Sequence, residues 1–160
     1  MTYHVYISNS GSTFLSHFLL DSSNGQIEPQ DDVSLGAAPG PLATDAAGRR
    51  MFVCLRSEKQ FASYDIDSAT GALRQIGVVD VPDGAPYVSL DDTDQYLLAS
   101  YYGAGHISVH AIGADGSLSA EPLQWIETAT HAHSIQTDPS NRFAFVPHTN
   151  PANAIYQFKF

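Results

Sequence analysis

Short runs of apolar and β-branched residues alternate along the whole chain with turn segments rich in Gly, Asp, Asn and Pro. Several runs alternate polar and apolar residues with the two-residue period of a β-strand, as in the Tyr-His-Val-Tyr-Ile segment at residues 3–7. No stretch shows the helical period of about 3.6 residues. The pattern therefore predicts an all-β protein built from short strands.

The strand-like runs recur with a fixed period. Three strands end in an aspartate, and these residues (Asp45, Asp91 and Asp138) are 46 and 47 residues apart. Seven residues after each aspartate, the next strand carries a large apolar residue (Phe52, Leu98 and Phe145). A further strand recurs at Phe14, Phe61, Ile107 and Ile155, in steps of 47, 46 and 48 residues. We therefore expect four repeats, at about 1–40, 41–85, 86–131 and 132–160.

Each complete repeat contains four predicted strands, here called A to D. In the second repeat they fall at Leu42–Asp45, Arg50–Leu55, Phe61–Ile66 and near Ile76–Val81. Four strands in about 45 residues are typical of a β-propeller blade. A β-sandwich made of hairpins is the alternative, but it does not need a fixed period. The sequence therefore predicts a β-propeller of four-stranded antiparallel blades.

The first repeat lacks strand A and the last lacks strand D, so we expect about 3.5 blades. This is half of the number of strands that a ring of seven four-stranded blades requires. We therefore expect the chain to be half of such a propeller. The open edges of its blades favour self-association, because unpaired strands pair readily with other chains.

Composition narrows the range of partners and compartments. Seventeen acidic and seven basic residues give a net charge of −10, which disfavours binding to nucleic acid. The single cysteine, Cys54, allows no intrachain disulfide and fits a reducing compartment. A strand begins at once near the N-terminus, with neither a signal peptide nor a membrane-spanning run. We therefore expect a cytoplasmic protein with no membrane partner.

Three segments resemble one known family: Phe52–Glu58 (FVCLRSE), Leu98–Val109 (LASYYGAGHISV) and His131–Pro147 (HAHSIQTDPSNRFAFVP). They are similar to the lactonase family of 6-phosphogluconolactonases, which are seven-bladed propellers. The resemblance implies an enzyme without metal or cofactor that hydrolyses a sugar lactone, 6-phosphogluconolactone, in the pentose phosphate pathway. Two alternatives stay open. One is a related lactonase or carboxy-cis,cis-muconate cyclase, and the other is a non-catalytic propeller that binds proteins.

The order of strands in a blade places several polar side chains on one rim. Because consecutive strands alternate in direction, the start of strand A, the end of strand B and the start of strand C lie on the same side of the ring. The candidates predicted for this rim are His131, His133, Arg56, Glu58, Tyr101, Tyr102 and His148. Propellers and other scaffolds usually bind ligands at such loop-bearing rims.

Lactone hydrolysis requires a base that activates water and donors that stabilise the oxyanion. Histidine suits the role of base, because its pKa of about 6.5 lies near neutral pH. The resemblance points to His133 as the base, with His131 as a neighbour that orients or binds the substrate. In the alternative interpretation, one or both histidines only hydrogen-bond the backbone.

The other candidates have predicted binding roles. Arg56 is expected to contact an anionic group of the substrate, unless it forms a salt bridge with Glu58, which is a weaker candidate for an acid or base. Tyr101 and Tyr102 point to opposite faces of their strand, so at most one can enter the channel and the other packs between blades.

His148 is either a substrate-binding residue or an exposed loop residue. The four remaining histidines have no metal-ligand spacing, and we predict no metal site.

Overall fold

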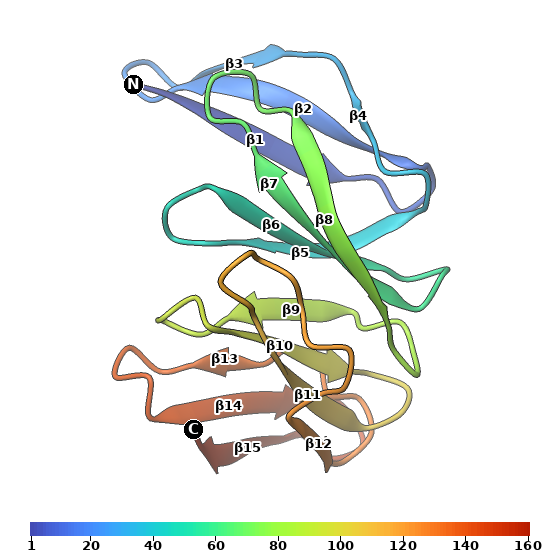
Figure 1. Cartoon of the computed structure of the whole chain (residues 1–160). Helices are drawn as coiled ribbons and strands as arrows, with labels where there is room; N and C mark the ends of the chain where they lie inside the picture. The colour runs from blue at the N-terminus through green and yellow to red at the C-terminus, as the bar shows by residue number, and fades with distance from the viewer.

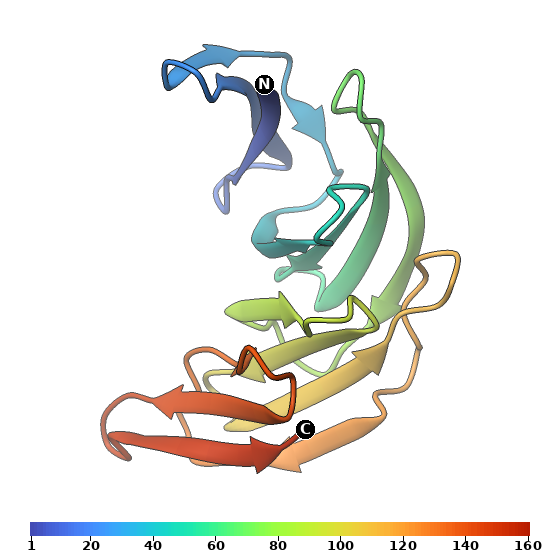
Figure 2. The same ribbon diagram turned by 90° about the vertical axis from the view of Figure 1, so that its left-hand side faces the viewer.

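The computed structural model describes all residues, 1–160, and consists of β-strands joined by turns. The strands form four antiparallel sheets, which follow one another along a curved arc from the N-terminus to the C-terminus (Figures 1 and 2). The arc stays open between its first and last sheets (Figure 2). This confirms the predicted fold class, an arc of β-propeller blades. The chain contains no helix that could cross a membrane.

We call the four sheets blades 1 to 4. Blade 1 contains β1 (Thr2–Ser8), β2 (Phe14–Asp21), β3 (Gln26–Pro29) and β4 (Val33–Ser34). Blade 2 contains β5 (Pro39–Thr44), β6 (Arg50–Leu55), β7 (Gln60–Ile66) and β8 (Leu73–Asp80). Blade 3 contains β9 (Tyr87–Leu90), β10 (Tyr96–Tyr101), β11 (His106–Ala111) and β12 (Gln124–Glu127). Blade 4 contains β13 (Gln136–Thr137), β14 (Phe143–His148) and β15 (Ala154–Lys159).

Blades 1 and 4 are incomplete in the way that the sequence predicts. Blade 1 starts at strand B and blade 4 stops at strand C. One detail differs, because strand D of blade 1 is divided into β3 and β4, which both pair with β2. Gln30 to Asp32 separate these two pieces, so the chain has one more strand segment than the sequence predicts.

The core of the molecule lies between successive blades. In β6, Met51, Val53 and Leu55 pack in the cluster that faces blade 1, whereas Phe52 and Cys54 pack in the cluster that faces blade 3. All five are less than 5% exposed. A strand buried on both faces needs apolar residues at consecutive positions, which explains the unbroken apolar run from Met51 to Leu55.

The register of blade 1 corrects one predicted equivalence. Leu15 pairs with Ser8, as Phe61 pairs with Cys54 in blade 2. Leu15 is therefore the equivalent of Phe61, and both are completely buried. The sequence analysis placed Phe14 at this position, one residue too early, because two apolar residues stand side by side there.

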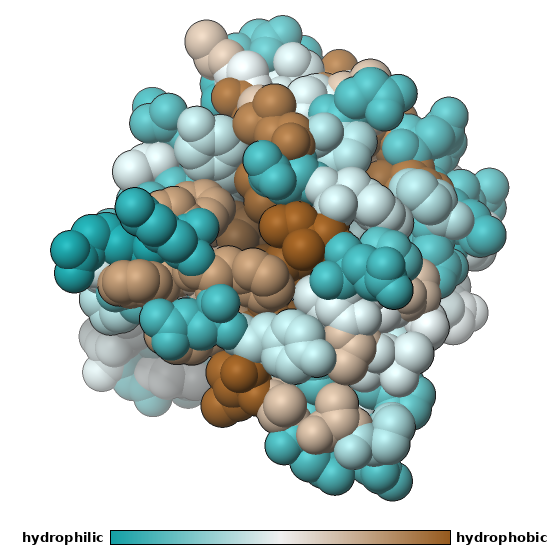
Figure 3. Space-filling model, turned by 90° about the horizontal axis from the view of Figure 1, so that it is seen from below, coloured by the Kyte–Doolittle hydropathy of each residue, from teal (hydrophilic) through white to brown (hydrophobic).

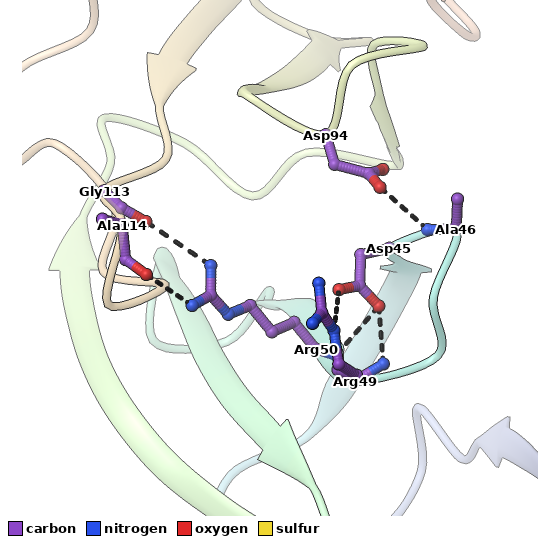
Figure 4. A network of polar contacts seen from close by, with 7 residues as sticks. All are labelled: Asp45, Ala46, Arg49, Arg50, Asp94, Gly113 and Ala114. Carbon is purple, nitrogen blue, oxygen red and sulfur yellow. Dashed lines mark hydrogen bonds and ion pairs between the residues drawn. The ribbon is translucent and has the colours of Figure 1, made fainter.

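The three repeated aspartates shape the turn between strands A and B. One carboxylate oxygen of Asp45 accepts the backbone N–H groups of Arg49 at 2.6 Å and Arg50 at 3.0 Å (Figure 4). Asp91 and Asp138 accept the corresponding N–H groups four and five residues further on. The Asp94 carboxylate also accepts the N–H of Ala46 at 3.0 Å, which ties the turns of blades 2 and 3 together (Figure 4).

Arg50 forms a second link between these blades. Its guanidinium donates to the carbonyl oxygens of Ala114 at 2.6 Å and Gly113 at 3.5 Å (Figure 4). These polar contacts all belong to the rim that carries the A-to-B turns. The B-to-C turns lie on the opposite rim.

Candidate functional site

Three turns form the rim on which the sequence analysis placed its candidates. They follow β6, β10 and β14 at residues 56–59, 102–105 and 149–153. Because each blade repeats the same strand order, these turns lie on the same side of the arc. The segments that lead from one blade to the next, such as residues 128–135, run along this side too.

A glycine lets the connecting segment after β12 lie directly on the turn after β10. A Cβ atom on Gly105 would lie 3.1 Å from backbone atoms of Ala129 and Thr130, and the φ angle of +66° also favours glycine. The Thr128 N–H donates to the Gly105 carbonyl at 2.7 Å, and the His131 N–H donates to the Tyr102 carbonyl at 2.7 Å. This close approach brings His131 next to Tyr102.

His131 joins the turns of blades 3 and 4. Its carbonyl accepts the N–H of Thr149 at 3.2 Å, and its Nδ1 contacts the carbonyl oxygen of Asn150. A carbonyl oxygen only accepts, so the proton of a neutral His131 ring resides on Nδ1 and Nε2 is left as an acceptor. The residue has a φ of +66°, a conformation that these contacts hold in place.

Tyr102 connects the two histidines. Its ring stacks on His131 with centroids 4.4 Å apart and meets His133 edge-on at 5.9 Å. The Tyr102 hydroxyl lies 3.1 Å from the Thr149 hydroxyl, so the ring is held between two turns. The His133 N–H donates to the Pro147 carbonyl at 2.9 Å, while its ring is exposed and makes no hydrogen bond within the chain. One half-buried and one exposed imidazole thus lie around the ring of Tyr102.

The two histidines precede strand A rather than begin it. In blade 4 this strand, β13, is limited to Gln136–Thr137. Ala132, between the histidines, forms an isolated bridge with His148. The two histidines are therefore attached to blade 4 by their backbone, while their side chains stay at the surface of the rim.

Arg56 and Glu58 lie on the equivalent turn of blade 2 and are not paired with each other. Glu58 accepts a hydrogen bond from Ser57 at 3.4 Å, and the Arg56 guanidinium forms no ion pair. Arg56 borders a cavity of about 350 Å³ that it shares with Ser10, Ala38, Pro39, Ser57, Asp83 and Gly84. The salt bridge considered for these two residues is thus absent, and Arg56 remains available to an anion.

Two of the predicted site residues are buried in the core. Tyr101 is fully buried, and its hydroxyl lies 3.1 Å from the Ser108 hydroxyl. Burial raises the pKa of Tyr101 above its ordinary value. Leu97 and Ala99, which precede Tyr101 by four and two residues, lie on the same buried face of β10. Tyr101 therefore packs between blades and only Tyr102 reaches the rim.

His148 is neither an exposed loop residue nor an exposed binding group. It ends β14 and is 4% exposed, with Nδ1 3.0 Å from the Val146 carbonyl and its ring 4.4 Å from that of Tyr156. Ala144 and Val146, two and four residues earlier, lie on the same buried face. This two-residue alternation was the signal in the sequence that could have placed His148 inside. Thr149 is the site residue that sequence reasoning missed.

No group of three or more His, Cys, Asp or Glu side chains has an arrangement that could hold a metal ion. The rim can instead supply an exposed imidazole, a second imidazole with a free acceptor nitrogen, and a guanidinium on a neighbouring turn. These groups suit proton transfer and the binding of an anionic, hydroxylated molecule.

Comparison with known proteins shows the family to which the fold belongs. The family model described as "Lactonase, 7-bladed beta-propeller" matches residues 3–160. The 6-phosphogluconolactonase of Serratia proteamaculans is 31% identical over 143 residues, which cover 89% of this chain and 42% of that protein. The 6-phosphogluconolactonase of Bacillus subtilis is 28% identical over 154 residues, which cover 92% of this chain and 44% of that protein.

The chain therefore spans less than half the length of these relatives. Among solved structures, the periplasmic gluconolactonase of Pseudomonas aeruginosa superposes with a TM-score of 0.84 at 22% identity. The superposition covers all of this chain and 50% of that protein. This likeness shows the propeller fold.

Proposed function

Since the chain belongs to the family of seven-bladed β-propeller lactonases, we propose that its rim forms part of a lactone-hydrolysing site that acts on 6-phosphogluconolactone. The observation that carries the proposal is the cluster of His131, Tyr102 and His133, brought together from two connecting segments of the rim. The relatives named 6-phosphogluconolactonase support this choice of substrate. We also propose that the protein works in a reducing compartment, the cytoplasm, because its one cysteine, Cys54, is buried and unpaired.

In the proposed reaction, His133 acts as the general base. Its exposed ring accepts a proton from a water molecule while that water attacks the lactone carbonyl. The C–O bond of the ring then breaks, and the proton is returned to the leaving alkoxide, which gives the open-chain acid. The absence of any hydrogen bond from the His133 ring to the protein leaves both of its nitrogens free for this role.

His131 and Tyr102 position the substrate and the base. The Nδ1 contact with Asn150 leaves Nε2 of His131 as an acceptor for a sugar hydroxyl. Tyr102 holds the two imidazoles apart and limits the movement of the His133 ring. Arg56, which has no acidic partner, contacts the anionic group of the substrate from the turn of blade 2.

The proposal is tested by following lactone opening in the presence of the purified chain. We expect the isolated chain to be inactive or far slower than a full-length relative, so the variants are compared in a chain completed by the C-terminal part of such a relative. His133→Ala is expected to lower kcat by about 10²-fold, the usual contribution of a general base. His106→Ala serves as the matched control, because His106 lies near the same rim but stacks on Trp125.

Glucono-1,5-lactone, which lacks the phosphate, is the comparison substrate. If His133→Ala and wild type open the phosphorylated lactone at the same rate, His133 is not the base. A preference for the unphosphorylated lactone would instead favour a related lactonase.

A further inference from the structure

The cavity of about 350 Å³ beside Arg56 is lined mainly by polar and small residues from three blades. Ser10 lies in the turn after β1. Arg56 and Ser57 lie in the turn after β6, and Asp83 lies in the segment that leads to β9. The surface at the last sheet is different, because apolar side chains gather at its centre with polar residues around them (Figure 3). All residues around the cavity lie between positions 10 and 84, so the cavity does not involve either end of the chain.

Glycine occupies two positions of the repeat that carry histidine in blade 4. Gly40 and His133 both stand five residues before the repeated aspartate of their blades. Gly84 and His131 both stand seven residues before it. Arg56, like Tyr102, is the first residue of the turn after strand B, so Gly84 takes beside it the place that His131 takes beside Tyr102. The imidazole that covers Tyr102 has no counterpart over Arg56, and the cavity occupies the space.

The Arg56 side chain lies directly on the first of these glycines. A Cβ atom on Gly40 would lie 2.6 Å from Cγ and 2.7 Å from Cδ of Arg56, and 3.0 Å from the Cys54 carbonyl oxygen. A Cβ atom on Gly84 would lie 3.0 Å from the Arg56 carbonyl oxygen. Neither glycine has a positive φ, so close packing is what requires glycine at these two positions. The stem of Arg56 is thus held in place while its guanidinium borders the cavity.

Asp83 brings a carboxylate to the same cavity. The residue is half-buried, and its Oδ1 accepts the N–H of Gly84 at 2.8 Å. Its Oδ2 accepts no hydrogen bond from the chain, and Asp83 forms no ion pair with Arg56. The cavity therefore offers a guanidinium that binds anions and a carboxylate oxygen that only accepts hydrogen bonds.

A molecule that satisfies both groups carries an anion and hydroxyl groups together. A bare anion pairs with Arg56 but is repelled by Asp83, because like charges at short range repel each other. A neutral sugar gives hydroxyl donors to Asp83 but leaves Arg56 without a partner. A phosphorylated polyol supplies a partner to each of them.

We propose that this cavity binds the phosphorylated end of the substrate, with Arg56 on the phosphate and Asp83 as the acceptor for neighbouring sugar hydroxyls. The identity of this substrate rests on the proposed function, whereas the roles of the two side chains rest on the geometry of the cavity. Asp83 determines specificity, because its charge selects against anions that lack hydroxyl groups. Gly40 is a positioning residue, since it leaves the space in which the Arg56 stem lies.

Calorimetric titration with two ligands tests the proposal. Sorbitol 6-phosphate carries a phosphate and a neutral polyol, inorganic phosphate carries no polyol, and neither contains a lactone. We expect sorbitol 6-phosphate to bind about 10-fold more tightly than inorganic phosphate, which is the gain typical of a hydrogen bond to a charged group. Arg56→Gln is expected to weaken the binding of both ligands by about 10-fold.

Asp83→Ala gives the decisive result, because the two ligands respond differently. The preference for sorbitol 6-phosphate is expected to disappear with the acceptor, while inorganic phosphate binds more tightly once the like charge is removed. Asp83→Asn, which keeps an acceptor for the Gly84 N–H, is expected to tighten inorganic phosphate in the same way. Asp92→Ala is the control of equal charge, because Asp92 is exposed in the turn after β9 on the opposite rim, and we expect it to leave the preference unchanged.

A second pair of variants tests the seat of Arg56. Gly40→Ala is expected to weaken the binding of both ligands, because the new Cβ atom displaces the Arg56 stem. Gly11→Ala is the matched control, since a Cβ atom there meets no other atom within 4 Å.

The titrations are made with the chain alone and with the chain completed by the C-terminal part of the Serratia proteamaculans relative, and circular dichroism verifies folding. Equal affinity of wild type for the two ligands would overturn the proposal. So would an Asp83→Ala variant that weakens inorganic phosphate as much as sorbitol 6-phosphate. A completed chain that shows the expected affinities but opens no lactone would refute the proposed function alone, and one that opens the lactone without these affinities would refute the role of the cavity alone.

Discussion

Histidine occurs in two different environments in this chain. His131 and His133 lie at the rim around Tyr102, whereas His17 and His110 are buried between blades. Burial lowers the pKa of His17, and the neighbouring charge of His4, 2.8 Å away, lowers it further. Burial also lowers the pKa of His110, although its hydrogen bond to the Ser119 carbonyl acts in the opposite direction. The buried pair therefore affects stability, whereas the rim pair is the one that we propose for the chemistry.

The lowered pKa of His17 predicts how stability depends on pH. Because the folded pKa lies below the ordinary value of 6.5, the unfolded chain takes up this proton first as the pH falls. The free energy of unfolding is therefore expected to decrease as the pH falls below about 6.5. Urea titrations between pH 7.5 and 5.5 measure this decrease.

His17→Gln is the variant that assigns the effect. It removes the group that titrates, so we expect a weaker dependence on pH over the same interval, with His110 left to contribute in the same direction. An identical dependence in the variant and in wild type would show that His17 is not responsible. The aspartates do not titrate appreciably between pH 7.5 and 5.5, because their ordinary pKa of 3.8 lies well below this interval.

At the scale of strands and turns, the repeated aspartate organises each blade. Asp91 is 3% exposed, and its carboxylate accepts the N–H groups of Gln95 and Tyr96 and the side-chain amide of Asn141 in blade 4. Burial opposes the charge, but hydrogen bonds from Thr93, Asn141 and the backbone hold the pKa of Asp91 below its ordinary value. One side chain thus closes its own turn and binds the next blade.

Asp91→Ala is expected to lower the free energy of unfolding by about 2–3 kcal/mol, because several buried N–H groups lose a charged acceptor. Asp115→Ala is the matched control, since Asp115 makes hydrogen bonds only within its own exposed turn, to Ser117. Urea unfolding of both variants provides the comparison. If the loss is as small for Asp91 as for Asp115, the contact between the turns does not stabilise the blades.

The sequence predicts these elements well because each strand and turn is a local pattern. The apolar run in β6 and the spacing of Asp45, Asp91 and Asp138 are sufficient to identify a blade. The errors have local causes. Phe14 and Leu15 are both apolar, so composition alone does not choose between them, and His148 follows proline in a segment that looks like a loop.

The site is less predictable than the fold. Its contacts join turns of different blades, such as that of Tyr102 with Thr149, which are 47 residues apart. No local pattern reports such a contact.

At the scale of the whole molecule, the four blades form an open arc (Figure 2). The groups of the rim come from blades 2, 3 and 4, and no single blade contains them all. A site assembled across blades depends on the angle between them, so the distance between His133 and Arg56 is expected to depend on closure of a ring such as the seven-bladed one of the family. This dependence on closure is the reason why we expect the isolated chain to be inactive or very slow.

A chimera tests the central claim, that this chain supplies the base of a lactone hydrolase, most directly. In it, residues 1–160 replace the matched N-terminal part of the Serratia proteamaculans relative, which is 42% of that protein. The quantity to measure is kcat/KM for 6-phosphogluconolactone, with and without His133→Ala. We predict an active chimera that loses about 10²-fold with the substitution. A chimera that folds and remains inactive, or one whose activity is unchanged by His133→Ala, would contradict the account.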